Sequence, residues 1–166
     1  MKTSKLLSMA VASAFVVGCG NTDNKGNDKA GAIGASNAAQ KVYVAPGEYD
    51  EYYAFLSGGF SGQLATYGLP SGRLLKVIPV FSQDPEKGYG YNEETKPLLQ
   101  TTHGFIPWDD THHPDLSQTN GEVDGRWIFI NGNNTPRVAR ISLKTFETEE
   151  ILELPNVGGN HSSTFV

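Results

Sequence analysis

The sequence is nearly free of cysteine, because Cys19 is the only one among its 166 residues. Disulfide bonds within the chain are therefore excluded, and a lone cysteine at this position leaves no thiolate for a metal or for catalysis. Basic residues are also in the minority, since 13 lysines and arginines stand against 18 aspartates and glutamates, a formal net charge of −5. This balance excludes a nucleic-acid-binding protein on electrostatic grounds.

A long apolar run is missing as well. The run from Leu6 to Gly18 has 13 residues, whereas a membrane-spanning helix needs about 20. It follows Lys2 and Lys5 and leads through a small residue into Cys19. This pattern predicts a signal peptide over residues 1–18 with a bacterial lipobox, so that Cys19 becomes the lipidated first residue of a periplasmic protein that only its lipid tethers to the membrane. An ordinary signal peptide that happens to contain a cysteine is the alternative.

Residues 19–40 lack large apolar side chains, with Ile33 as the only one. Such a segment cannot bury enough apolar surface to offset the entropy of ordering, so we expect a flexible tether. The folded part is therefore predicted to comprise residues 41–166. Removal of residues 1–18 takes away two lysines and no acid, so that 11 basic residues remain against 18 acidic ones.

No window from Lys41 onward has a helical period of sufficient length, and the sequence predicts an all-β fold. Apolar runs are short, rich in aromatic and β-branched residues, and separated by Gly, Pro and Asn. The predicted strands are Tyr52–Leu56, Gln63–Leu69, Leu74–Phe81, Arg126–Asn131, Arg137–Leu143 and Glu150–Leu154.

An internal repeat relates two parts of this region at a constant offset. It pairs Phe55 with Phe129, Gly58 with Gly132, Ala65 with Ala139 and Leu69 with Leu143. Each copy ends in an apolar strand closed by proline, at Pro79 and Pro155, which makes the second copy slightly longer. With one more strand before it, each unit would form a four-stranded propeller blade, and the connector 82–125 carries an insertion. Chance similarity between hairpins is the alternative.

Chemically active side chains concentrate between Asp109 and Asp115, which holds His112 and His113. Imidazole is a versatile metal ligand, and a nearby carboxylate can orient its ring. Adjacent residues of a regular strand point to opposite faces. The pair could therefore serve one small metal site only if the backbone departs from a strand there, which Pro114 favours. A polar loop without metal is the alternative.

The repeat relates a third histidine to this pair. His113 precedes the second aromatic strand, and His161 follows the second outer strand, close to one blade length further along the chain. Both fall where the chain returns from an outer strand to an innermost one, which in a propeller lies at the central channel. We expect these imidazoles to converge on the axis, and we interpret His103 as a loop residue of the insertion.

Several motifs occur in a fixed order from about Tyr43 to the end of the chain. The histidine stretch is followed by a glycine-flanked turn, an aromatic strand and a basic strand, and it is preceded by an acidic aromatic segment. These motifs are Pro46 to Tyr53, Ser57-Gly58-Gly59, Ile78 to Phe81, Asp110-Thr111-His112-His113-Pro114, Gly121 to Gly125, Arg126 to Asn131 and Arg137 to Ile141. Together, and in this order, they resemble nitrous-oxide reductase.

The resemblance implies a fold and an activity. The family folds as a seven-bladed β-propeller followed by a cupredoxin domain, so that residues 41–166 would be about two blades at its N-terminal end. It reduces nitrous oxide to dinitrogen and water, the last step of denitrification, at a tetranuclear copper–sulfide centre on the propeller axis. Electrons from a periplasmic donor such as a c-type cytochrome arrive through a dinuclear copper site of the partner subunit in a homodimer.

The resemblance also implies roles for particular residues. The family's adjacent histidine ligands match His112 and His113, and its next histidine ligand matches His161. Asp110 matches the family's acid two residues before the pair, and we interpret it as a group that supports the ligands without binding the metal. The better-known branch has cysteine at Thr111 and histidine at Asp115, and it carries a twin-arginine signal. Threonine together with the lipobox is more similar to the second, Sec-exported branch of the family.

The resemblance places the remaining histidine ligands, the calcium site and the dinuclear copper site beyond Val166. We therefore expect a fragment of a longer coding sequence that is neither stably folded nor active alone. Two other functions fit the residues without the family. One is a propeller lipoprotein with a mononuclear zinc hydrolase site, in which three histidines leave a position open for water. The other is a non-enzymatic binding propeller whose histidines fill the channel.

Replacement of Cys19 by alanine tests the predicted anchor. The Cys19→Ala protein should not be lipidated or processed at this site, because the thiol that receives the lipid is gone. Metabolic labelling with a radioactive fatty acid measures this directly, with the parent protein as the positive control. Equal label in the two proteins would rule out the lipobox.

Overall fold

A computed structural model describes residues 35–157 of the chain, with side-chain environments from residue 38 onward. The predicted signal peptide, the predicted lipidation site Cys19 and the predicted ligand His161 lie outside these residues. Across the described range, no helix combines the length and the apolar character that crossing a membrane would require.

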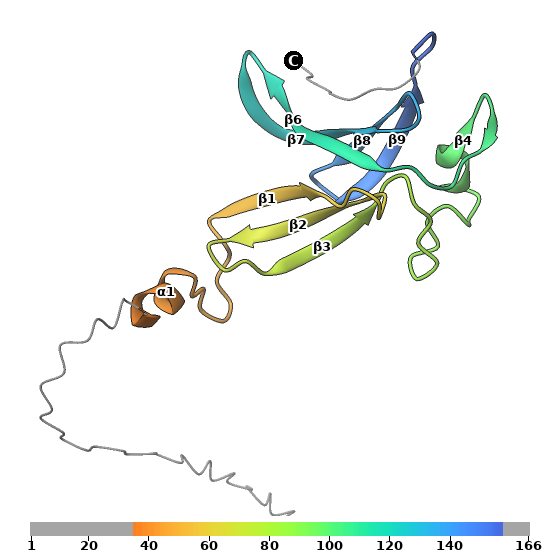
Figure 1. Cartoon of the computed structure of the whole chain (residues 1–166). Coiled ribbons are helices and arrows are strands. Elements are labelled where there is room, and N and C mark those ends of the chain that lie inside the picture. The colour runs from red at the N-terminus through yellow and green to blue at the C-terminus, as the bar shows by residue number, and fades with distance from the viewer. Residues whose placement is uncertain (1–34, 158–166) are drawn as a thin grey trace, which may run out of the picture. The chain divides into compact units, whose positions relative to one another are not determined.

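The described chain consists mostly of strands and loops, which confirms the all-β prediction. Two antiparallel sheets hold most of the strands, one with the order β1-β2-β3 and one with the order β6-β7-β8-β9 (Figure 1). Their bounds are β1 Tyr52–Ser57, β2 Gln63–Leu69, β3 Leu74–Pro79, β6 Thr111–Thr119, β7 Glu122–Gly132, β8 Arg137–Ser142 and β9 Glu147–Glu153. All six predicted strands are present within a few residues of their predicted bounds.

Smaller elements lie before and between the two sheets. Helix α1 (Ala35–Lys41) stands at the end of the segment that the sequence predicts to be a flexible tether. The predicted insertion contains the 3-10 helix η1 (Lys96–Leu99) and a hairpin of β4 (Gln100–Thr101) and β5 (Gly104–Phe105). His103 lies in the turn of this hairpin, as expected for a loop residue.

The sequence predicts one further strand at the start of each unit but does not locate it. In the second sheet this strand is β6, which contains both His112 and His113. Its apolar residues do not alternate regularly, and Pro114 removes one ladder donor, so it has no strand pattern. The second sheet thereby has four strands, as expected for a complete unit. The first sheet has three within the described residues.

The register of the strands confirms the repeat. Phe55 pairs with Thr66 in the first sheet, and Phe129 pairs with Arg140 in the second. Phe129 follows Phe55 in the sequence by the same number of residues as Arg140 follows Thr66. The register irregularity after Thr66 in the first sheet also recurs after Arg140 in the second. Phe55 and Phe129 therefore occupy equivalent positions of successive units.

One detail of the predicted repeat is wrong. The sequence suggests that Pro79 matches Pro155 and that the second copy is slightly longer. Gln63 pairs with Pro79 in the first sheet, and Arg137 pairs with Glu153 in the second, so the equivalent of Pro79 is Glu153. A proline near the end of both strands does not show that the two prolines are equivalent, because proline can end a strand at any position of the register.

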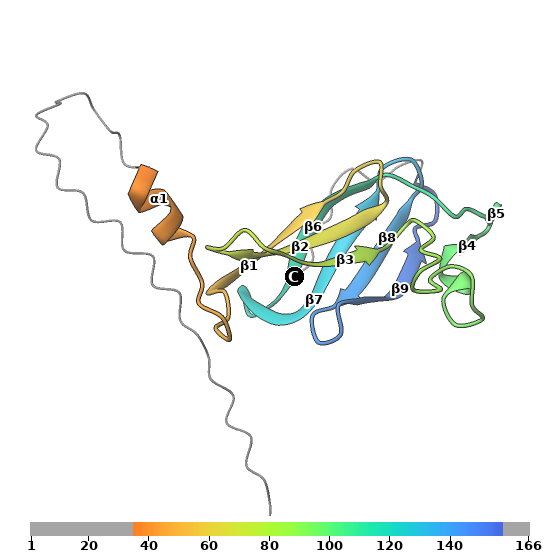
Figure 2. The same cartoon turned by 90° about the horizontal axis from the view of Figure 1, so that it is seen from below.

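The two sheets pack against each other through a continuous apolar core. The first sheet lies below the second in Figure 1 and overlaps it in the view from below in Figure 2. The first sheet contributes Leu64 and Ile78, and the second contributes Ile128, Ile130, Ala139 and Ile141, all fully buried. Leu64 of the first sheet and Ala139 of the second both face the shared core. The repeat equivalent of Leu64 is Val138, and neighbouring residues of a strand point to opposite faces, so Val138 points away from this core. The sheets therefore pack head to tail, with one face of a unit against the opposite face of the next.

Candidate metal centre

The histidine pair lies at a break in the regular pairing of β6 with β7. His112 pairs with Asn131, but the next pair is Asp115 with Phe129, so one extra residue is accommodated in β6. His113 has a φ of 48°, in the left-handed region that residues other than glycine seldom adopt. This β-bulge is the departure from a regular strand that a shared metal site requires.

The bulge brings the two imidazoles together. Their ring centroids lie 5.6 Å apart, and the ring planes are inclined at 61°. In an undisturbed strand the two side chains would stand on opposite faces of the sheet. His112 is partly buried and His113 is exposed. The two rings thus form an accessible pair of nitrogen donors.

A carboxylate orients the first ring of the pair. Asp110 Oδ2 lies 3.2 Å from His112 Nε2, and only 9% of the Asp110 side chain is exposed. The other oxygen, Oδ1, is buried and has no hydrogen-bond partner among the described residues. A carboxylate in this position fixes the orientation of the imidazole, as in carboxylate–histidine–metal arrangements.

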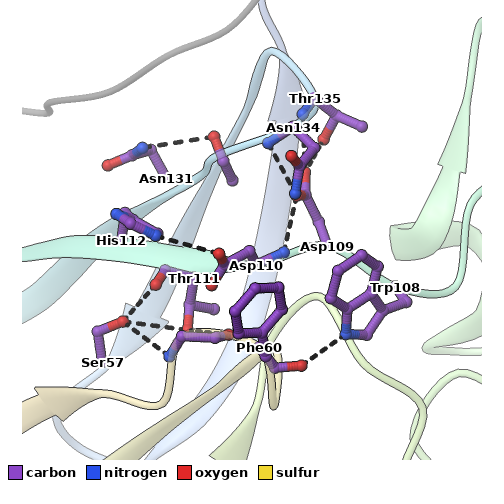
Figure 3. A network of polar contacts seen from close by, with 12 residues as sticks. Ser57, Phe60, Trp108, Asp109, Asp110, Thr111, His112, Asn131, Asn134 and Thr135 are labelled. Atoms are coloured by element: carbon purple, nitrogen blue, oxygen red, sulfur yellow. Dashed lines mark hydrogen bonds and ion pairs between the residues drawn. The ribbon is translucent and has the colours of Figure 1, made fainter.

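A second carboxylate, Asp109, fastens the same stretch to its own sheet (Figure 3). Asp109 is fully buried. It accepts hydrogen bonds from the backbone N–H and the side-chain amide of Asn134, and from the backbone N–H and the hydroxyl of Thr135. A Cβ atom on Gly132 would lie 2.4 Å from Asp109 Oδ2, so this approach requires glycine. Asp109 therefore determines the β7–β8 turn and the start of β6 together.

Arg137 lies beside Asp109 in the interior, and only 1% of its side chain is exposed. Its Nη2 is 3.7 Å from Asp109 Oδ2, and its guanidinium lies 4.8 Å from the ring centroid of Phe81. Burial lowers the pKa of Arg137, and the Asp109 carboxylate acts in the opposite direction. The two buried charges thus depend on each other.

Thr111 attaches the stretch to the first sheet. Its backbone N–H donates to Gly59 O at 3.0 Å, and its hydroxyl donates to Gln63 O at 3.0 Å. The hydroxyl of Ser57 donates to Thr111 O. Residues 109–111 are therefore held by both sheets, directly before the histidines.

An exposed aromatic pair flanks this attachment. The rings of Phe60 and Trp108 stack with centroids 6.3 Å apart and planes inclined at 5°, and Trp108 Nε1 donates to Phe60 O at 2.7 Å (Figure 3). The contact joins the β1–β2 loop to the residue before Asp109. It reinforces the same junction from the solvent side.

The structure brings three predicted site residues together, namely Asp110, His112 and His113. His161 lies outside the described residues, and His103 lies apart from the pair in the β4–β5 turn. Among residues 35–157 there is no group of three or more His, Cys, Asp or Glu side chains arranged to hold a metal ion. The pair and its carboxylate fit part of an imidazole-ligated site for copper, zinc, iron or nickel. The remaining donors of such a site would come from other residues.

The sequence motif alone does not predict the roles of Asp109, Thr111 and Ser57 in this arrangement. The available signal was weak, since an acid next to a histidine pair can orient it, and an Asn-Asn-Thr turn offers several donors to one carboxylate. Which acid serves which purpose depends on the pairing of β6, which the sequence does not reveal.

Comparison with curated proteins identifies nitrous-oxide reductases as relatives, although no family model matches the chain. The protein from Pseudomonas fluorescens is 38% identical over 159 residues, which is 96% of this chain and 24% of the relative. The protein from Stutzerimonas stutzeri is 41% identical over 122 residues, 74% of this chain and 19% of the relative. The protein from Cupriavidus necator is 40% identical over 140 residues, 82% of this chain and 22% of the relative. The chain thus spans about a quarter or less of the length of these proteins.

Removal of the Asp109 charge tests the internal anchor. Asp109→Asn should lower the free energy of unfolding by about 3–5 kcal/mol, because it leaves Arg137 buried without its counter-charge and places an amide among donors. Urea unfolding of the whole protein that carries this segment measures the change, with tryptophan fluorescence as the signal, since Trp108 and Trp127 belong to this segment.

The matched control for this experiment is Glu150→Gln, which removes one partner of an exposed ion pair with Arg140 at 3.3 Å. Its cost should stay below about 0.5 kcal/mol. Equal effects of the two substitutions would show that Asp109 is not an anchor.

Proposed function

Because the chain is a relative of nitrous-oxide reductase along most of its own length, as its sequence motifs predict, we propose that it supplies part of the copper site at which nitrous oxide is reduced to dinitrogen and water. The observation that carries this proposal is the β-bulge that directs His112 and His113 toward each other. A histidine pair in a polar loop would need neither the left-handed residue nor the buried carboxylate.

The proposed ligands in this chain are His112, His113 and His161. When bound, a tetranuclear copper–sulfide centre supplies the electrons of the reduction, which consumes two electrons and two protons for each nitrous oxide. Within the chain, His112 and His113 hold their imidazole rings close together. Asp110 fixes the ring of His112 through Nε2, which leaves Nδ1 as the nitrogen directed away from this carboxylate.

The arrangement of the two sheets supports a propeller as the scaffold of this site. Their register repeats at a constant offset, and they pack head to tail, so that further copies of the unit could be added in the same way. We propose that the sheets are successive blades of a seven-bladed ring. In such a ring β6 is the innermost strand of its blade, which would bring His112 and His113 to the central channel.

The proposal extends to the setting of the whole protein. The lipobox-like sequence before Cys19 supports export and a lipid tether in the periplasm. Electrons would come from a periplasmic donor such as a c-type cytochrome, through a dinuclear copper site in the partner subunit of a homodimer. We place that site, and a calcium site, in parts of the protein that this chain does not include.

Alanine substitutions of the histidines test the copper proposal in the whole protein that carries this segment. His112→Ala, His113→Ala and His161→Ala should each lower the copper content of the cluster and abolish nitrous-oxide reduction. The spectrum of the dinuclear copper site should persist, because its ligands lie elsewhere. Metal analysis, optical spectroscopy and turnover measure these effects.

His103→Ala serves as the matched control, because His103 is an exposed histidine in the β4–β5 turn. It should retain copper and activity. A His113→Ala protein with full copper content and normal turnover would refute the proposed role of the pair. Colourless zinc in the parent protein would favour a hydrolase instead, and a parent protein without metal would favour a binding module.

A further inference from the structure

The residue before the histidine pair has several hydrogen bonds to the neighbouring sheet. Thr111 is fully buried. Its hydroxyl lies 3.0 Å from Gln63 O and 3.3 Å from Gly59 O, and the hydroxyl of Ser57 lies 3.2 Å from it. The backbone of Thr111 adds a bridge to Gly59. The start of β6 is thus attached to the β1–β2 loop of the first sheet (Figure 3).

The bulge that follows needs such support. His113 has a left-handed backbone conformation, which glycine adopts easily but a residue with a Cβ atom does not. Conformations of this kind persist only where the surrounding structure imposes them. Pro114 has no backbone N–H with which to hold the strand on its other side. Regular pairing with β7 resumes only at Asp115. The bonds just before the pair therefore have a large share in determining where the two rings point.

The side chains that make this attachment carry hydroxyl groups and no charge. Ser57 Oγ donates to Thr111, and it also accepts a hydrogen bond from the backbone N–H of Gly59 at 3.2 Å. Ser57 is the last residue of β1, and its hydroxyl is hydrogen-bonded to Thr111 and Gly59. We therefore expect its influence on the pair to pass through Thr111.

We propose that Thr111 and Ser57 are positioning residues of the copper site, whose hydroxyl groups clamp the start of β6 to the first sheet and so set the direction of His112 and His113. This inference rests on the proposed function. Ligands of one metal cluster that come from different parts of a chain must converge within fractions of an ångström. A clamp between two sheets supplies this precision, because it ties the pair to the neighbouring unit as well as to its own.

The hydroxyl of Thr111 can be removed with little change of shape. Valine keeps the branched side chain and occupies a similar volume. The two carbonyl groups that Thr111 faces keep other partners, since Gln63 O also accepts from the backbone N–H of Gly58 and Gly59 O also accepts from that of Thr111. Thr111→Val should therefore fold, and its effect should fall mainly on the position of the bulge.

Thr148 offers a matched control. It is also buried, and its hydroxyl donates to Pro79 O at 2.8 Å, a bond that likewise joins the second sheet to the first. It belongs to the outer strand β9, whereas the histidines stand in β6. Thr148→Val removes an equivalent hydrogen bond without disturbing the start of β6.

The experiment compares Thr111→Val, Thr111→Ser, Ser57→Ala and Thr148→Val in the whole protein, with copper affinity and the optical spectrum of the cluster as the first readouts. Thr111→Val should bind copper roughly tenfold or more weakly and shift the spectrum, as loss of a supporting group near metal ligands does. Ser57→Ala should act in the same direction. Thr111→Ser keeps the hydroxyl and should restore the parent values, and Thr148→Val should match the parent.

A second readout is independent of copper. In the metal-free protein labelled with nitrogen-15 at histidine, the ring signals of His112 and His113 should move in Thr111→Val and remain in place in Thr148→Val. If the parent protein binds no copper, the proposed function fails, and these signals still decide whether the clamp exists. Unchanged copper binding and unchanged signals in Thr111→Val would overturn the inference. An equal loss in Thr148→Val would also overturn it, because the effect would then be general.

Discussion

The structure depends on how residues 109–111 are fastened at the junction of the two sheets. Asp109 is bonded to the β7–β8 turn of its own sheet, and Thr111 is bonded to the β1–β2 loop of the other. Both side chains are fully buried, so their polar groups have to be paired inside the protein. A shift of either sheet would leave several buried donors or acceptors without partners. The junction therefore has one favourable geometry, and the histidine pair follows it directly.

The polar junction and the apolar core have different tasks. Leu64, Ile78, Ile128 and Ile141 bury the facing surfaces of the sheets, a contribution that is large but without direction. Apolar burial has no preferred direction of its own, whereas hydrogen bonds to fixed carbonyl groups do. The junction supplies the direction that the core lacks. The proposed metal site would benefit from this division, because it requires stable sheets and accurately placed ligands at once.

The acidic residues at the site are distinguished by their surroundings. Asp109 is saturated with donors and lies next to a buried arginine, which makes it an internal anchor. Asp110 faces the histidine pair and keeps one buried oxygen without a partner among the described residues. Neighbours in the chain thus serve different purposes, because the backbone directs one toward the turn and the other toward the imidazoles. The same division extends to Thr111 and His112, where a structural residue is followed by a proposed ligand.

The sequence by itself determined the all-β class, the six strands with apolar patterning and the internal repeat that relates Phe55 to Phe129, because these depend on local alternation and on turn residues. Its motifs also identified the relatives. The tertiary structure alone decided the position of β6, whose mixed polarity and Pro114 conceal a strand, and it showed that Pro79 matches Glu153. It also decided that His112 and His113 meet at a bulge and that Asp109 and Thr111 hold them from two sheets. Pairing between strands sets these features, and it joins residues as far apart as Ser57 and Thr111, so no local pattern could reveal them.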